Sequence, residues 1–252
     1  MKYDEDYMIW ADSFKEGEWA VNLLIRDSKF KLVNLEFRYN FQPVFYIKYS
    51  KKIIRCTVYG GYKAWANKPE PVEKFLEISR PDVIVYNVNT DKVVLAIEET
   101  AAVPTGNQSL QRLERVWWAA ELKIPFVYLI TEYGVHKDGN LRKNSIWPAY
   151  LGLKLCSQYD TPSLTMLFGD KDHPEDYAFG PGVGFLSELM GLYIQEDLGS
   201  NIKVDLKSLL IKIIQDMNQF ILSHKDNISK SLPGCDILVD KKYIEYVAES
   251  IM

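Results

Sequence analysis

The most constraining stretch of the sequence is a pair of β-branched apolar runs, 83–86 and 93–97, on either side of a cluster of turn-forming residues. Short Val- and Ile-rich runs around Asn, Thr and Asp residues are typical of a β-hairpin. Asp82 opens the first predicted strand, and Glu98 and Glu99 close the second. In an antiparallel pair the start of one strand lies beside the end of the other, so we expect these acids to meet at one end of a sheet.

Carboxylates held this close repel one another, which raises the pKa of at least one of them unless a cation lies between them. A hard divalent metal ion, which prefers oxygen ligands, is the natural partner of such a pair. Side chains alternate across a strand, so only one of Glu98 and Glu99 can face Asp82. We choose Glu98, because this leaves the polar Thr100 rather than Ala101 at the next position on that face. The main-chain carbonyl of Glu99 is a further expected metal ligand.

The alternative is that these acids are ordinary strand ends that face water, with Pro81 only shaping a turn. The composition of the chain leaves both interpretations open. Its formal net charge of −4 carries no global signature of nucleic-acid binding, although a local basic groove can lie on an acidic protein.

The rest of the composition is that of an ordinary globular protein. The 252 residues suit one domain with a substantial core. The three widely spaced cysteines predict reduced thiols and a cytoplasmic location. The acidic N-terminus has no apolar segment, which predicts no signal peptide, and no apolar run is long enough to span a bilayer. We therefore expect no membrane partner.

Periodicity along the chain predicts helices and strands around one sheet. Ser13 and Glu16 have the spacing of a capping box, so we expect a helix to begin there. Alternating runs between 34 and 59 predict an antiparallel meander, and 132–148 is expected to be a long polar loop. We predict a single α/β (α+β) domain over 1–252, with a central mixed sheet flanked by helices, an extra N-terminal meander and C-terminal helices over about 182–252.

At the hairpin the sequence resembles the PD-(D/E)xK nuclease superfamily. The resemblance is carried by Pro81-Asp82, by Glu98-x-Thr100 at the end of the next strand, and by a following helix with Gln111 and Arg112. It implies a restriction-endonuclease-like core of helix, three strands, helix and strand, here within about 13–168. It also implies a metal-dependent hydrolase of DNA phosphodiester bonds, with a type II restriction endonuclease as the expected form.

The resemblance assigns roles to individual residues. Asp82 and Glu98 would hold Mg²⁺, for which Mn²⁺ is expected to substitute. Thr100 occupies the position of the motif lysine, and a threonine can hydrogen-bond water but carries no charge. The next helix offers Arg112 and Arg115 in place of the lysine, although an arginine stays protonated and so clamps a phosphate better than it carries a proton. Gln111 resembles a helix glutamine of recombination nucleases in the superfamily, and with Arg112 it is an expected catalytic residue.

Further residues are expected to assist. Glu16 and Glu18 match an extra acid that some members carry on the first helix, and a favourable interaction with the helix dipole is the alternative role of both. The residues expected to contact nucleic acid are Gln108, Arg115, Lys137, Arg142 and Lys143.

Three functions remain open from the sequence. The first is a restriction endonuclease that acts on double-stranded DNA, for which a homodimer is the simplest way to cut both strands. The second is an RNA nuclease or structure-specific nuclease of the same superfamily. The third is a catalytically degenerate nucleic-acid-binding protein on the same fold, which the missing lysine keeps open.

Overall fold

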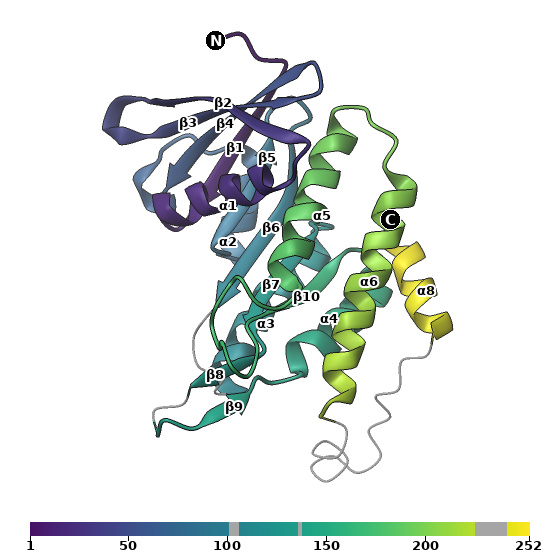
Figure 1. Cartoon of the computed structure of the whole chain (residues 1–252). Coiled ribbons are helices and arrows are strands. Elements are labelled where there is room, and N and C mark those ends of the chain that lie inside the picture. The colour runs from purple at the N-terminus through teal and green to yellow at the C-terminus, as the bar shows by residue number, and fades with distance from the viewer. Residues whose placement is uncertain (101–105, 136–137, 225–240) are drawn as a thin grey trace. The chain divides into compact units, whose positions relative to one another are not determined.

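The structure, a computed structural model, describes residues 1–100, 106–135, 138–224 and 241–252, and only the backbone of 106–111 and 241. The protein is a mixed α/β protein with a large mixed sheet flanked by helices (Figure 1). The chain forms two compact units. The first comprises Met1–Glu98 and Leu186–Ile202, and the second comprises Glu99–Phe185 and Lys203–Met252.

Six strands build the sheet of the first unit. They are β1 (Glu5–Ala11), β2 (Phe30–Phe37), β3 (Pro43–Tyr49), β4 (Lys52–Gly60), β5 (Val83–Asn87) and β6 (Lys92–Thr100), whose last two residues belong to the second unit. Their order is β6-β5-β1-β4-β3-β2. The β1–β4 pair is parallel and the other pairs are antiparallel. The predicted meander and hairpin are thus confirmed as β2–β3–β4 and β5–β6.

Strand β1 is the main departure from the sequence analysis, which predicted no strand before residue 13. It lies between β4 and β5, and it buries Tyr7, Ile9, Trp10 and Ala11 almost completely. Its apolar run is short and follows an acidic start, so local periodicity does not distinguish it from a leader to the first helix. The two pairing partners that make it a strand are far away in the sequence.

Helix α1 (Phe14–Arg26) begins at the predicted cap. The Glu16 main-chain N–H donates to Ser13 Oγ at 3.2 Å, and the Ser13 N–H donates to Glu16 Oε2 at 2.8 Å. Gly17 lets this helix approach β4, because a Cβ there would lie 2.3 Å from Val58 Cγ1. The helix therefore starts close to the point where β1 ends.

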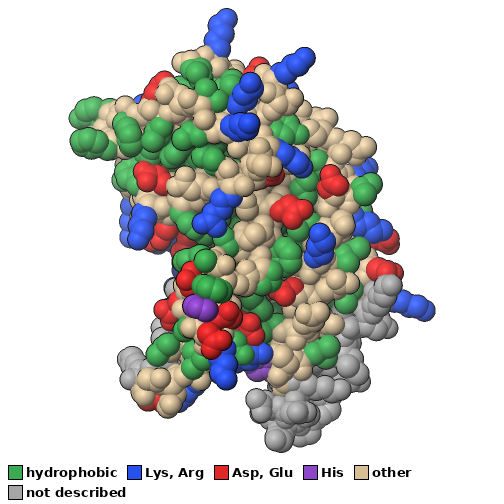
Figure 2. All heavy atoms as spheres, in the orientation of Figure 1, with side chains coloured by type: hydrophobic (Ala, Val, Ile, Leu, Met, Phe, Trp, Pro, Cys, Tyr) green, Lys and Arg blue, Asp and Glu red, His purple; other side chains and the backbone are tan. Residues whose placement is uncertain are grey.

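The first unit also contains two 3₁₀ turns and a short helix. They are η1 (Tyr39–Phe41), η2 (Tyr62–Ala64) and α2 (Glu70–Ile78). η1 lies at the tip of the β2–β3 hairpin, where hydrophobic side chains gather on the surface (Figure 2). Among them Tyr39 is 89% exposed and Phe41 is 85% exposed.

Most of helix α5 (Gly182–Asp197) belongs to the first unit, although it is far from β1 in the sequence. Ser187 Oγ donates to the Leu23 carbonyl at 2.7 Å. At the other end, Asp197 Oδ2 accepts hydrogen bonds from Tyr7 Oη at 3.0 Å and from Asn87 Nδ2 at 2.9 Å. These contacts tie the end of α5 to strands β1 and β5.

The second unit is built on two parallel strands, β7 (Phe126–Thr131) and β10 (Ser163–Phe168). Both are buried along their whole length, and helices α3, α4 and α6 pack on them. The helices among the described residues of this unit are α3 (Gly106–Glu121), α4 (Trp147–Tyr159), α6 (Lys203–Leu222) and α8 (Lys241–Ser250). No helix of the described residues is both long enough and apolar enough to cross a bilayer.

The expected loop over 132–148 is wrong in part. It contains a small antiparallel pair, β8 (Tyr133–Val135) and β9 (Leu141–Lys143), in which Tyr133 lies opposite Lys143. Each strand is only three residues long. This is too short for an alternating pattern to stand out from a polar loop.

Candidate active site

The two acids of the predicted pair lie at neighbouring strand ends of the first unit. Val83 of β5 pairs with Ile97 of β6, and one further step of this register sets Asp82 opposite Glu98. Opposed residues of an antiparallel pair point to the same face of the sheet. Glu98 is 0% exposed, whereas Asp82 is half-buried. Glu99 alternates to the other face and is half-buried.

A third acid, Asp12, continues the row on the other side of Asp82. Ala11 of β1 pairs with Val83, and the Asp12 main-chain N–H donates to the Asp82 carbonyl at 3.0 Å. The ends of β1, β5 and β6 therefore carry three acids, which we call the acid row: Asp12, Asp82 and Glu98. Asp12 is not predicted from the sequence because β1 is not. The signal that could have found it is an acid directly after the apolar run 7–11.

Tyr62 of η2 lies against this row. Its hydroxyl donates a hydrogen bond to the carbonyl oxygen of Pro81, the residue before Asp82. Burial raises the pKa of the Tyr62 hydroxyl well above its ordinary value, and nearby negative charges raise it further, in the order Asp82, Asp12, Glu16 and Glu98. The hydroxyl therefore stays protonated and remains a donor at neutral pH. Tyr62 fixes the peptide that carries Asp82.

The two acids predicted on the first helix differ in their surroundings. Glu16 is near enough to act on Tyr62, but its carboxylate also accepts hydrogen bonds from the Ser13 N–H and from Ser13 Oγ. It thus serves the helix cap. Glu18 is half-buried two residues further along α1.

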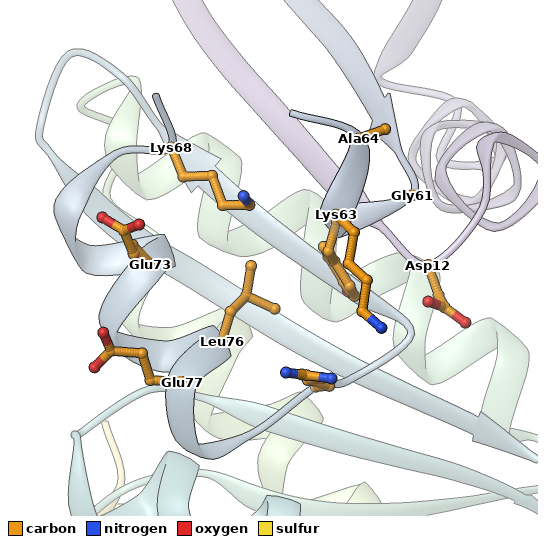
Figure 3. Close-up of a pocket in the computed structure, with 10 residues that line it drawn as sticks. Asp12, Gly61, Lys63, Ala64, Lys68, Glu73, Leu76 and Glu77 are labelled. Atoms are coloured by element: carbon orange, nitrogen blue, oxygen red, sulfur yellow. The ribbon is translucent and has the colours of Figure 1, made fainter. Parts of the chain in front are cut away.

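A cavity of about 600 Å³ opens beside Asp12 (Figure 3). Its wall carries three cations and three acids: Lys63, Lys68, Arg80, Asp12, Glu73 and Glu77. Figure 3 shows Lys63 extending into the cavity between Asp12 on one side and the α2 acids Glu73 and Glu77 on the other. Acids and cations thus meet in one opening, and Asp12 belongs both to this opening and to the acid row.

The remaining predicted catalytic residues belong to the second unit. Thr100 is buried at the end of β6. Arg112 Nη1 donates to the Glu99 carbonyl oxygen at 3.0 Å, so this expected metal ligand already accepts a hydrogen bond. Arg115 is half-buried on α3. The side chains of Gln108 and Gln111 lie outside the described residues.

The predicted cations of the β8–β9 pair have partners within the second unit. Arg142 forms an ion pair with Asp138 at 2.8 Å. Lys143 forms an ion pair with Glu132 at 3.2 Å and donates to Ser223 Oγ at 2.7 Å. Lys137 lies outside the described residues. A nucleic acid bound here would compete with these partners.

The donor atoms of the acid row suit one kind of metal ion. Among the described residues, no group of three or more His, Cys, Asp or Glu side chains could hold a metal ion. Mg²⁺ is commonly bound through only one or two carboxylates, with waters and substrate phosphates as its other ligands. Asp82 and Glu98 at adjacent strand ends provide such a carboxylate pair, so these two residues fit Mg²⁺ or Mn²⁺.

Comparisons with known proteins add little to this geometry. No protein-family model matches the chain, and no curated protein matches it. Among solved structures, the cytosolic domain of the T. maritima FeoB iron transporter in GDP form II is 11% identical with a TM-score of 0.31, and the match covers 97% of each chain. Form I of the same domain is 10% identical with a TM-score of 0.28, over 96% of this chain and 94% of that one. Likenesses at this level support no assignment of fold or function.

Proposed function

We propose that this protein is a metal-dependent endonuclease of double-stranded DNA, in the form of a type II restriction endonuclease on a PD-(D/E)xK-like core. The observation that carries the proposal is the acid row at the ends of three adjacent strands, beside a cavity that also contains cations. Phosphodiester hydrolysis needs both kinds of group. Acids hold the metal ion, and cations stabilise the negative charge that builds on the phosphate while water attacks it.

Each residue of the row contributes in a different way. Asp82 and Glu98 would hold the ion, and the burial of Glu98 keeps bulk water from screening its charge. Asp12 is exposed and lines the cavity, so its carboxylate can accept a hydrogen bond from water there. Tyr62 holds the Pro81 carbonyl and so orients Asp82. The chemistry that Mg²⁺ supplies at such a site is Lewis-acid stabilisation of phosphate oxygens and activation of water.

Plasmid and bacteriophage DNA incubated with Mg²⁺ or Mn²⁺ test the proposal. The wild-type protein should give discrete fragments, whereas Asp82→Asn and Glu98→Gln should each lower the cleavage rate by at least about a hundredfold, since each removes a charge that stabilises the transition state. Glu114→Gln, at an exposed acid on α3, is the matched control and should cut normally. Undiminished cleavage by both row variants, or no cleavage of any DNA by the wild type, would contradict the proposal.

A second candidate is a nucleic-acid-binding protein without catalysis. It is favoured by Thr100, which is buried and uncharged where the motif has a lysine. Calorimetric titration with Mn²⁺ in the presence of DNA separates the two functions. No heat of binding at millimolar metal would favour the non-catalytic candidate, and metal binding that Asp82→Asn abolishes would favour the nuclease. RNA and branched DNA as substrates in the cleavage assay test the RNA nuclease and the structure-specific nuclease.

A further inference from the structure

The hydrogen bond from Tyr62 to Pro81 joins two loops of the first unit, and each loop carries a cation next to the bonded residue. Lys63 directly follows Tyr62, and Arg80 directly precedes Pro81. Both cations line the same cavity as Asp12. One buried contact therefore holds the backbones from which the two positive side chains extend.

The loop that carries Lys63 is anchored at several points. Gly61 adopts φ +78°, a backbone conformation that glycine takes at little cost. Trp65 Nε1 donates to the Gly60 carbonyl at 2.9 Å, and Lys68 Nζ donates to the Trp65 carbonyl at 2.6 Å. Lys68 is thus engaged in holding the loop, which positions Lys63 before any ligand arrives.

Lys63 and Arg80 are exposed, and neither makes a hydrogen bond or an ion pair with any residue that the structure describes. An ammonium group and a guanidinium group together suit a phosphate. The guanidinium offers a planar fork of donors, and the ammonium offers a compact point charge. Glu73 and Glu77 repel an anion from one side of Lys63, and Asp12 repels it from the other, so a phosphate is attracted only close to the two cations.

We propose that Lys63 and Arg80 bind a phosphate group of the DNA backbone in this cavity. This inference rests on the proposed function and names the residues that supply the positive charge absent at Thr100. Asp12 is the link, because it lines the cavity and its N–H bonds the Asp82 carbonyl at 3.0 Å. A phosphate held by the two cations lies beside the acid row.

Fluorescence anisotropy with a short fluorescein-labelled DNA duplex, in EDTA so that no cleavage occurs, tests the inference. The variants are Lys63→Gln, Arg80→Gln and both together. Lys92→Gln, an exposed lysine at the other end of β6, is the matched control. Each cavity variant should weaken binding by about tenfold, as expected for one charge-assisted hydrogen bond. The plot of log K against log salt between about 50 and about 200 mM should become shallower by about one for each cation removed. Lys63→Arg should retain most of the affinity.

The outcomes separate this inference from the proposed function. If the wild type cleaves DNA and the double variant binds and cleaves as the control does, the phosphate site is wrong and the nuclease stands. If the wild type cleaves nothing while binding depends on Lys63 and Arg80, the nuclease is wrong and the phosphate site stands. Wild-type protein that binds no duplex at low salt overturns the inference directly.

Discussion

Among single residues, Tyr62 links several features of the candidate site. Its hydroxyl is buried, bonds the Pro81 carbonyl and lies within reach of the charges of four acids. A buried donor of this kind contributes through the acceptor it satisfies, because a carbonyl left without a partner in the interior costs free energy.

We therefore expect Tyr62→Phe to lower the free energy of unfolding by about 1–2 kcal/mol. Urea denaturation followed by far-UV circular dichroism measures this change. Tyr39→Phe is the control, because Tyr39 is 89% exposed at the tip of its hairpin. Equal urea midpoints for Tyr62→Phe and Tyr39→Phe would show that the hydrogen bond to Pro81 contributes nothing to stability.

The acid row shows which residues sequence alone can find. Asp82 and Glu98 belong to one hairpin, where a turn of a few residues sets the pairing, so their meeting can be worked out from local patterns. Asp12 joins the row through the pairing of β1 with β5, which is not local. Lys63 and Arg80 share a cavity because of a hydrogen bond between residues 62 and 81, and no pattern in the sequence predicts that bond.

At the scale of elements, the contact between α1 and β4 depends on one glycine. Glycine inside a helix costs up to about 1 kcal/mol relative to alanine, so Gly17 looks unfavourable from the sequence. The close approach to Val58 explains it, since a Cβ at this position would lie 2.3 Å from Val58 Cγ1. The helix could not lie this near the strand with any larger residue.

Gly17→Ala should therefore destabilise the protein by about 1–3 kcal/mol, the usual cost of overpacking. Val58→Ala removes the clashing methyl group, so the double variant should be more stable than the sum of the two single changes allows. The free energies of unfolding of the four proteins, measured in urea, give the coupling. Strict additivity would mean that the helix shifts away from the strand.

Elements with a strong local signal were predictable, and those defined by distant partners were not. The capping box of α1, the β5–β6 hairpin and the β2–β3–β4 meander follow from spacing, alternation and turn residues. The parallel pairing of β1 with β4 requires a crossover through α1, β2 and β3. From the local sequence, β1 cannot be distinguished from an apolar segment that precedes a helix.

At the scale of the whole molecule, stability depends on pH through a half-buried acid of α6, Asp216. Burial, together with the nearby charge of Glu132, raises the pKa of Asp216 to about 6. Between about pH 4, where an unfolded aspartate titrates, and about pH 6, the folded state binds more protons than the unfolded state. The contribution of Asp216 to the free energy of unfolding is therefore greatest below about pH 4, and it is lost as the pH rises to about 6.

Asp216→Asn removes that dependence. The variant should gain stability relative to the wild type between pH 4 and pH 7, and the gain should be complete above pH 7. Urea midpoints of both proteins at several pH values measure the difference. A difference that stays constant with pH would place the Asp216 carboxylate in a well-solvated environment.

Helix α5 connects the two sequence segments that form the first unit. Asp197 accepts hydrogen bonds from Tyr7 and Asn87, and both donors are 0% exposed. Asp197→Ala should lower the free energy of unfolding by at least about 2 kcal/mol, because two buried donors lose their acceptor. Asp197→Asn keeps an acceptor oxygen and should cost less. Equal stabilities of the two variants in urea would contradict this account.

The position of Asp197 also affects the order of events during biosynthesis. Strands β1 to β5 leave the ribosome first, yet the Asp197 carboxylate is 110 residues behind Asn87 and 190 residues behind Tyr7. At a synthesis rate of about 5–20 residues per second, the delay after Asn87 is roughly 5–20 s. During that interval two polar groups of the nascent first unit depend on water, or on a chaperone, for their hydrogen bonds. A stalled chain that ends before residue 186 should therefore be digested by protease more readily than one that extends past residue 202.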